Sequence, residues 1–127
     1  MAKIVLDASA LLALLNNEPG RQIVEEQLPN SIISTVNLSE VITILTEIGV
    51  SAKESEIIIK ELVKEIIDFD QPQALTAAAL RKITKSCGLS LGDRACLALA
   101  KLKNLPVLTA DKAWHAINHG VKVYLVR

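Results

Sequence analysis

The chain has 127 residues, of which 50% are hydrophobic, and its 14 basic and 14 acidic side chains give no net charge. This length fits one domain, and an aliphatic composition with one Phe, one Trp and one Tyr suits a buried parallel sheet covered by helices. The zero charge and the scarcity of aromatic rings argue against a protein that coats nucleic acid or stacks single-stranded bases. Cys87 and Cys96 are too few for a disulfide scaffold and lack metal-ligand spacing, and we expect Cys96 to be a buried small side chain.

The N-terminal residues do not resemble a signal peptide, because Asp7 interrupts the first apolar run too early. No stretch is long and apolar enough to span a membrane. We therefore expect a cytoplasmic protein that does not associate with membranes.

The chain begins with an alternation of strand and helix signals. Residues 3–6 form a short apolar run that ends at Asp7, and residues 8–15 then follow a helical pattern. A second helix is expected at 20–28, and a second short strand at 31–34.

The middle of the chain predicts a helical hairpin. Residues 37–48 carry apolar side chains at helical spacing, and Gly49 is placed to end that helix. Ser51 opens the next helix, with Glu54 three residues later as a capping-box partner. The end of this apolar stretch, residues 65–69, is alternatively a third strand.

The last third of the chain predicts two helices and two strands. The helices are residues 73–86 and 91–102, and the strands are residues 106–108 and 121–126. The whole order predicts one α/β domain over residues 1–127, a three-layer α/β/α sandwich with a mostly parallel sheet.

Four acidic side chains are placed to meet at one edge of this sheet. Asp7 and Asp111 each follow a predicted strand, and ligands of open parallel sheets bind outside those strand ends. Glu40 and Asp93 lie in the first turns of helices that begin near the same edge. Clustered carboxylates need a proton or a cation to coexist, and an all-oxygen site suits Mg²⁺ or Mn²⁺.

Each acid alone also has a structural explanation, because each can cap a helix. Glu40 lies three residues after Asn37, and Asp93 lies three residues after Ser90, which are capping-box spacings. The four acids together, with no Lys or Arg beside Asp7 or Glu40, favour a cation site. A hard cation there would lower the pKa of a bound water and neutralise charge on a phosphoryl oxygen.

The segments around these acids resemble the motifs of PIN domains. Residues 6–12 resemble the opening Asp-x-Ser motif, residues 38–41 the second motif, residues 90–100 the third and residues 107–111 the fourth. The resemblance covers nearly the whole chain in order. The size of the chain and its third motif most resemble the VapC toxins of type II toxin–antitoxin systems.

This resemblance implies a metal-dependent endoribonuclease that uses Mg²⁺ or Mn²⁺ to hydrolyse RNA phosphodiester bonds. Asp7 and Asp93 would be the principal metal ligands, and Asp111 would bind the metal directly or through water. Glu40 would bind the metal or position the attacking water.

The resemblance also implies roles for two hydroxyls and for partners. Ser9 and Thr109 would hydrogen-bond the acids, and Ser9 could also touch a substrate phosphate, although local turn or cap bonds account for both hydroxyls equally well. Proteins of this kind are homodimers inhibited by a cognate antitoxin whose C-terminal tail crosses the active site. The helical hairpin, residues 37–63, would contribute to those contacts.

Three further polar side chains are interpreted as surface residues. Arg94 follows Asp93 and could hold a phosphate, but a solvated helix charge is the simpler account. His115 and His119 have the spacing of a helical metal pair, but no third ligand is placed near them, so both are expected at the surface.

Other functions fit the sequence less well. A phosphoryl-transfer protein of haloacid-dehalogenase type would carry a second Asp at the place of Ser9, and a receiver domain would need an acidic pair near its first strand. A solitary RNA-processing PIN nuclease and a PIN fold used only as a binding scaffold remain open, although the presence of all four acids argues against the scaffold.

Overall fold

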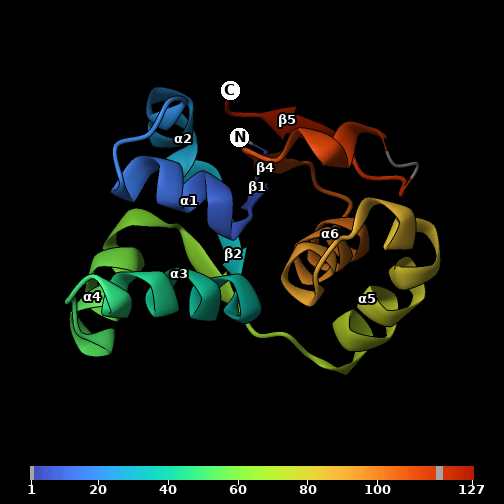
Figure 1. The fold of residues 1–127 in the computed structure, drawn as a ribbon, viewed down its shortest axis with the longest axis horizontal. Coiled ribbons are helices and arrows are strands. Elements are labelled where there is room, and N and C mark those ends of the chain that lie inside the picture. The colour runs from blue at the N-terminus through green and yellow to red at the C-terminus, as the bar shows by residue number, and fades with distance from the viewer. Residues whose placement is uncertain (1, 117–118) are drawn as a thin grey trace.

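The computed structural model describes residues 2–116 and 119–127, in which parallel strands form a central sheet with helices on both faces (Figure 1). The strands are β1 (Ile4–Leu6), β2 (Ser31–Ser34), β3 (Glu65–Ile67), β4 (Val107–Thr109) and β5 (Val123–Leu125). The α-helices are α1 (Ala8–Leu15), α2 (Arg21–Gln27), α3 (Thr35–Glu47), α4 (Ala52–Leu62), α5 (Gln71–Thr84) and α6 (Leu91–Lys103). Short 3₁₀ helices are η1 (Leu28–Asn30), η2 (Lys85–Cys87) and η3 (Lys112–Ala116). The predicted three-layer α/β sandwich is confirmed.

The strand order is β3-β2-β1-β4-β5, and every neighbouring pair is parallel. The chain moves outward from β1 through β2 to β3 and then returns to place β4 on the other side of β1. The direction of winding therefore changes between β1 and β4. In open α/β sheets this switch point opens a crevice at the carboxyl ends of the two strands.

Each central strand sends alternate side chains to opposite faces of the sheet. Ile4, Leu6 and Ile33 pack into one core with α1, α2, α3 and α4, whereas Val5 and Ile32 pack into a second core with α5 and α6. Figure 1 shows the two groups of helices on opposite sides of the sheet. Burial on both faces explains why β1 is wholly apolar and why the two middle residues of β2 are isoleucines.

The structure decides one alternative that the sequence left open and moves several predicted boundaries, among them that of β5, which spans Val123–Leu125 rather than residues 121–126. The ambiguous stretch at 65–69 contains a strand, β3, which pairs with β2. Helix α3 begins at Thr35, and its N-cap residue is Ser34, whose Oγ accepts from the Val36 N–H. The sequence prediction that Asn37 caps this helix is wrong. Helix α5 begins at Gln71 rather than 73, because Asp70 provides a cap whose Oδ1 accepts from the Gln73 N–H.

The second core also contains a histidine that the sequence placed at the surface. His119 is only 3% exposed. Its Nδ1 accepts from the Val121 N–H at 3.1 Å, so Nε2 carries the proton and donates to the Trp114 carbonyl oxygen at 3.0 Å. Burial lowers the pKa of His119, which keeps the ring neutral in this arrangement. The surface prediction is wrong for His119, and His115 is exposed as expected.

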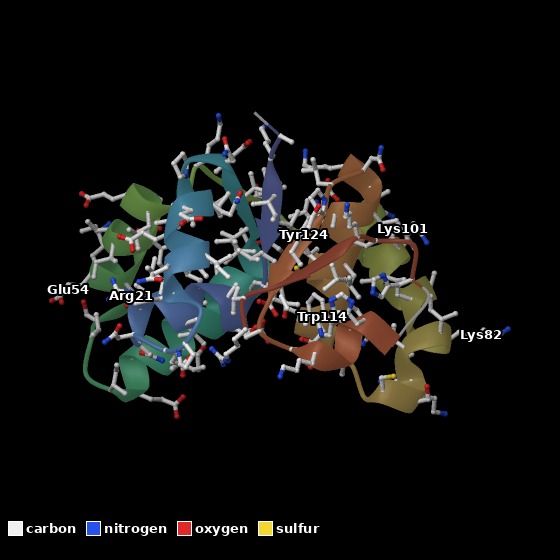
Figure 2. All side chains as sticks on the ribbon, turned by 90° about the horizontal axis from the view of Figure 1, so that it is seen from above. Arg21, Glu54, Lys82, Lys101, Trp114 and Tyr124 are labelled. Carbon is white, nitrogen blue, oxygen red and sulfur yellow. The ribbon has the colours of Figure 1, made fainter. Side chains whose placement is uncertain are left out.

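Trp114 itself is wholly buried between the C-terminal segment and α6 (Figure 2). Cys96 is also wholly buried, which confirms its predicted role as a small core residue. None of the helices in the described ranges is long and apolar enough to cross a membrane.

Candidate metal centre

Asp7 lies at the switch point, directly after β1, and is 3% exposed. It is the N-cap residue of α1, and its Oδ1 accepts from the Ala10 N–H at 2.8 Å. The backbone of Asp7 is tied to the neighbouring strand, because its N–H donates to the Leu108 carbonyl oxygen at 3.3 Å. The carboxylate is therefore held in one orientation at the carboxyl ends of β1 and β4.

Two hydroxyls complete the surroundings of this carboxylate. Thr109 donates through Oγ1 to Asp7 Oδ2 at 2.6 Å, and Ser9 Oγ lies 2.8 Å from both carboxylate oxygens. The same hydroxyls accept from the backbone beyond β4, Ser9 from Ala110 N–H at 2.9 Å and Thr109 from Asp111 N–H at 3.0 Å. They join the β1–α1 turn to the β4 loop.

Asp93 lies in the first turn of α6 and is half-buried. It forms a complete capping box with Ser90: the Ser90 N–H donates to Asp93 Oδ2 at 3.0 Å, and the Asp93 N–H donates to Ser90 Oγ at 3.2 Å. Asp111 is also half-buried, and its Oδ1 accepts from the Ala113 N–H at 2.9 Å. The described hydrogen bonds use one oxygen of each of these two carboxylates.

Glu40 lies on helix α3. Its half-buried carboxylate accepts from Asn37 Nδ2 at 2.8 Å and lies against Gly92, the residue before Asp93. Asn37 Nδ2 also donates to the Gly92 carbonyl oxygen at 3.0 Å. Sequence reasoning missed Asn37 and Gly92, because the spacing from Asn37 to Glu40 was interpreted as a helix cap.

The acids interact electrostatically. Burial, with a smaller contribution from the charge of Asp93, raises the pKa of Asp7 to about 6 against the opposing effect of its hydrogen bonds. Partial burial also raises the pKa of Asp93, and Asp111 adds to that rise. Cys96 lies within the field of Asp7, Asp93 and Glu40, and burial together with these charges keeps its thiol protonated.

Basic side chains do not compensate these charges through ion pairs. In the part of the chain that the structure describes, the ion pairs use the carboxylates of Glu18, Glu56 and Glu65 and none of the four candidate acids. A cluster of oxygen donors with unbalanced negative charge fits a hard divalent cation. Within residues 2–116 and 119–127, however, no three His, Cys, Asp or Glu side chains stand close enough to form a ready-made metal site.

Arg94 does not have the solvated position that the sequence suggested. It is half-buried, and its Nη1 donates to the Ala77 carbonyl oxygen on α5 at 2.9 Å. The guanidinium thus ties α5 to α6 one residue beyond Asp93, and its charge offsets a small part of the rise in the pKa of Asp93. The surface interpretation failed because the partner is a backbone carbonyl that a sequence pattern cannot reveal.

The sequence matches the PIN domain family over residues 4–120. No curated protein matches it. Among solved structures, a chain of a toxin–antitoxin complex from Klebsiella pneumoniae is 24% identical, with a TM-score of 0.77 and 98% of each chain covered.

Two further structures are similar over most of their length. A DNA-bound VapBC complex of Salmonella typhimurium shares 18% identity at a TM-score of 0.74, with both chains covered completely. A VapC toxin of Mycobacterium tuberculosis, described as cleaving the sarcin–ricin loop, shares 18% identity at a TM-score of 0.74. That match covers 90% of this chain and 94% of the toxin. At these identities the likeness establishes a shared fold.

Proposed function

The chain belongs to the PIN-domain family, and from this premise we propose that it is a metal-dependent endoribonuclease. The observation that carries the proposal is Asp7, a carboxylate that is 3% exposed and held by the backbone and two hydroxyls, with no cation among the partners described for it. Burial of an uncompensated carboxylate is costly. A divalent cation would remove that cost.

The proposed cation is Mg²⁺ or Mn²⁺, because all candidate ligands are carboxylate oxygens. Asp7 and Asp93 are its proposed principal ligands, and Asp111 binds it directly or through water. Glu40 binds it or positions the attacking water. When bound, such a cation lowers the pKa of a water molecule and offsets charge on the phosphoryl oxygens during hydrolysis.

The protein's own groups orient the site. Ser9 and Thr109 keep both oxygens of Asp7 fixed at the crevice, which reduces the reorganisation needed when a ligand binds. Ser9 is half-buried, and its hydroxyl is also proposed to contact a substrate phosphate. Ser90 fixes Asp93 through its backbone N–H.

We further propose that the nuclease is the homodimeric toxin of a toxin–antitoxin pair. The support is that the similar structure from Klebsiella pneumoniae is a toxin–antitoxin complex and that the similar Mycobacterium tuberculosis protein is a toxin. The α3–α4 hairpin also exposes apolar side chains that a partner protein could cover, namely Ile44, Ile48, Ile57 and Ile58. The antitoxin tail would cross the acidic crevice beside this hairpin.

The proposal is tested by incubating a mixed RNA pool with purified protein in Mg²⁺ or Mn²⁺ and in EDTA. Wild type is compared with Asp7→Asn and Asp93→Asn. We expect metal-dependent cleavage that either substitution abolishes. Cleavage that survives both substitutions would indicate a contaminating nuclease, and no cleavage by antitoxin-free protein would favour a binding scaffold. Metal-dependent cleavage by a protein that binds no antitoxin would favour a solitary RNA-processing nuclease.

A further inference from the structure

We infer that Asn37 and Gly92 are positioning residues that hold the Glu40 carboxylate at the N-terminus of α6, beside Asp93. This inference rests on the proposed function in one respect, because Glu40 is there assigned to the metal and its water. Neither residue would touch the substrate. Both act by deciding where the Glu40 carboxylate lies.

Asn37 connects two segments that are far apart in the sequence. Its amide nitrogen donates to Glu40 Oε1 at 2.8 Å and to the Gly92 carbonyl oxygen at 3.0 Å. Both partners are acceptors only, so the amide must present its NH₂ group to them and cannot be flipped. One side chain therefore fixes the Glu40 carboxylate relative to the backbone of α6.

The oxygen of the same amide makes no bond within the described residues that would explain Asn37. Asn37 is 1% exposed, and its Oδ1 is buried without a hydrogen-bond partner in the described part of the chain. A buried unpaired acceptor is unfavourable, and an apolar side chain of similar size would avoid it. The benefit of Asn37 thus lies in its two donated bonds, one of which orients Glu40.

Gly92 provides the space in which the carboxylate lies. A Cβ at this position would collide with the Glu40 carboxylate, whose carbon and both oxygens are the nearest atoms to it. Gly92 lies within helix α6, where glycine is less favourable than alanine. Its backbone does not have a positive φ, so space for Glu40, rather than backbone conformation, accounts for the glycine.

The experiment compares Asn37→Ala and Gly92→Ala with a matched control, Gln73→Ala. Gln73 is also a buried amide that donates to a backbone carbonyl, that of Asp68 at 2.9 Å, and leaves its oxygen unpaired, but its partners are not the candidate acids. Three quantities are measured for each protein: Mn²⁺ affinity by electron paramagnetic resonance, kcat and KM for RNA cleavage, and the melting temperature.

We expect Asn37→Ala and Gly92→Ala each to weaken Mn²⁺ binding and lower kcat by about 10- to 100-fold, with KM little changed. Gln73→Ala should match wild type in Mn²⁺ affinity and in kcat. Gly92→Ala should melt at or above the wild-type temperature, since alanine favours the helix and the flexible Glu40 side chain can move aside. The double variant Asn37→Ala/Glu40→Gln should be no worse than Glu40→Gln alone.

Losses that multiply in the double variant would overturn the inference, because Asn37 would then act independently of Glu40. Equal losses of Mn²⁺ affinity and kcat in Gln73→Ala would also overturn the inference, because removal of any buried amide would then have the same effect. If wild type binds Mn²⁺ but does not cleave RNA, the proposed function fails while the affinities still test Asn37 and Gly92. If wild type cleaves RNA and both variants equal it, only the inference fails. Absence of Mn²⁺ binding by wild type would overturn both.

Discussion

Helices α4 and α6 begin with the same local signature and end up in opposite environments. Each has a serine N-cap whose Oγ accepts from the backbone N–H of an acid three residues later, Ser51 with Glu54 at 3.1 Å and Ser90 with Asp93 at 3.2 Å. Glu54 is exposed at the periphery of the molecule (Figure 2), whereas Asp93 is half-buried within the field of Asp7 and Asp111. A cap signature therefore does not identify a site by itself, because the two helices differ in the acids that other segments bring near the cap.

The largest expected contrast between the two helices is catalytic. Asp93→Asn should lower the rate of RNA cleavage by about 1,000-fold or more, because it removes a proposed ligand from a site whose acids act together. Glu54→Gln should leave the rate unchanged. Rates are compared at saturating Mg²⁺, with circular dichroism to show that both variants fold. A similar loss in both variants would remove the distinction between the two caps.

Asp7 sharpens the comparison through pH, because burial raises its folded-state pKa to about 6 from an ordinary value of 3.8. The folded state therefore holds this proton more tightly than the unfolded state. Without metal, the free energy of unfolding should fall by about 3 kcal/mol as the pH rises from about 4 to 6, and change no further above that. Urea unfolding across this range checks the expectation.

Asp7→Asn should remove this fall and make the metal-free protein more stable than wild type at pH 7. The asparagine oxygen can still accept the Ala10 N–H, and its NH₂ group can donate to the Thr109 hydroxyl oxygen. Glu54→Gln is the control and should leave the pH dependence as in wild type. A wild-type stability that rises between pH 4 and 6 through the titration of Asp7 would contradict the assignment.

Metal should stabilise the protein through α6 and not through α4. A cation present at 100 times its Kd adds about 2.7 kcal/mol to the free energy of unfolding. We expect Mn²⁺ to raise the melting temperature of wild type and of Glu54→Gln, and to have little effect on Asp93→Asn. An equal rise in all three proteins, measured by calorimetry with and without EDTA, would place the cation elsewhere.

The smallest expected effects come from the caps themselves. Ser51→Ala and Ser90→Ala should each lower the free energy of unfolding by about 1 kcal/mol, since each removes one acceptor for a helix N–H. Ser90→Ala should in addition slow RNA cleavage slightly: the Ser90 backbone N–H still donates to the Asp93 carboxylate, but the first turn of α6, which carries Asp93, loses its cap. If Ser51→Ala slows cleavage equally, stability rather than the position of Asp93 explains the effect.

Much of this molecule follows from local rules. Alternation of apolar runs with helical spacing predicts the layers, and the strand signals before Asp7 and Asp111 predict that both acids lie at the carboxyl ends of strands. The Ser90–Asp93 capping box was also expected and is present, because both partners lie within one turn. Short-range spacing is sufficient wherever the interacting groups are three or four residues apart.

Long-range contacts are what only the folded chain decides. Asn37 has the spacing of a capping residue, yet its amide donates both to Glu40 and to the carbonyl oxygen of Gly92. Gly92 is 55 residues from Asn37 in the sequence. Arg94 has the pattern of a surface charge, yet it binds the backbone of α5. In both cases the partner is a backbone carbonyl brought near by the packing of another helix, and a carbonyl is the same in every residue. The residue sequence therefore does not predict which carbonyl group becomes the partner. The position of that carbonyl group depends on how the helices pack against the sheet.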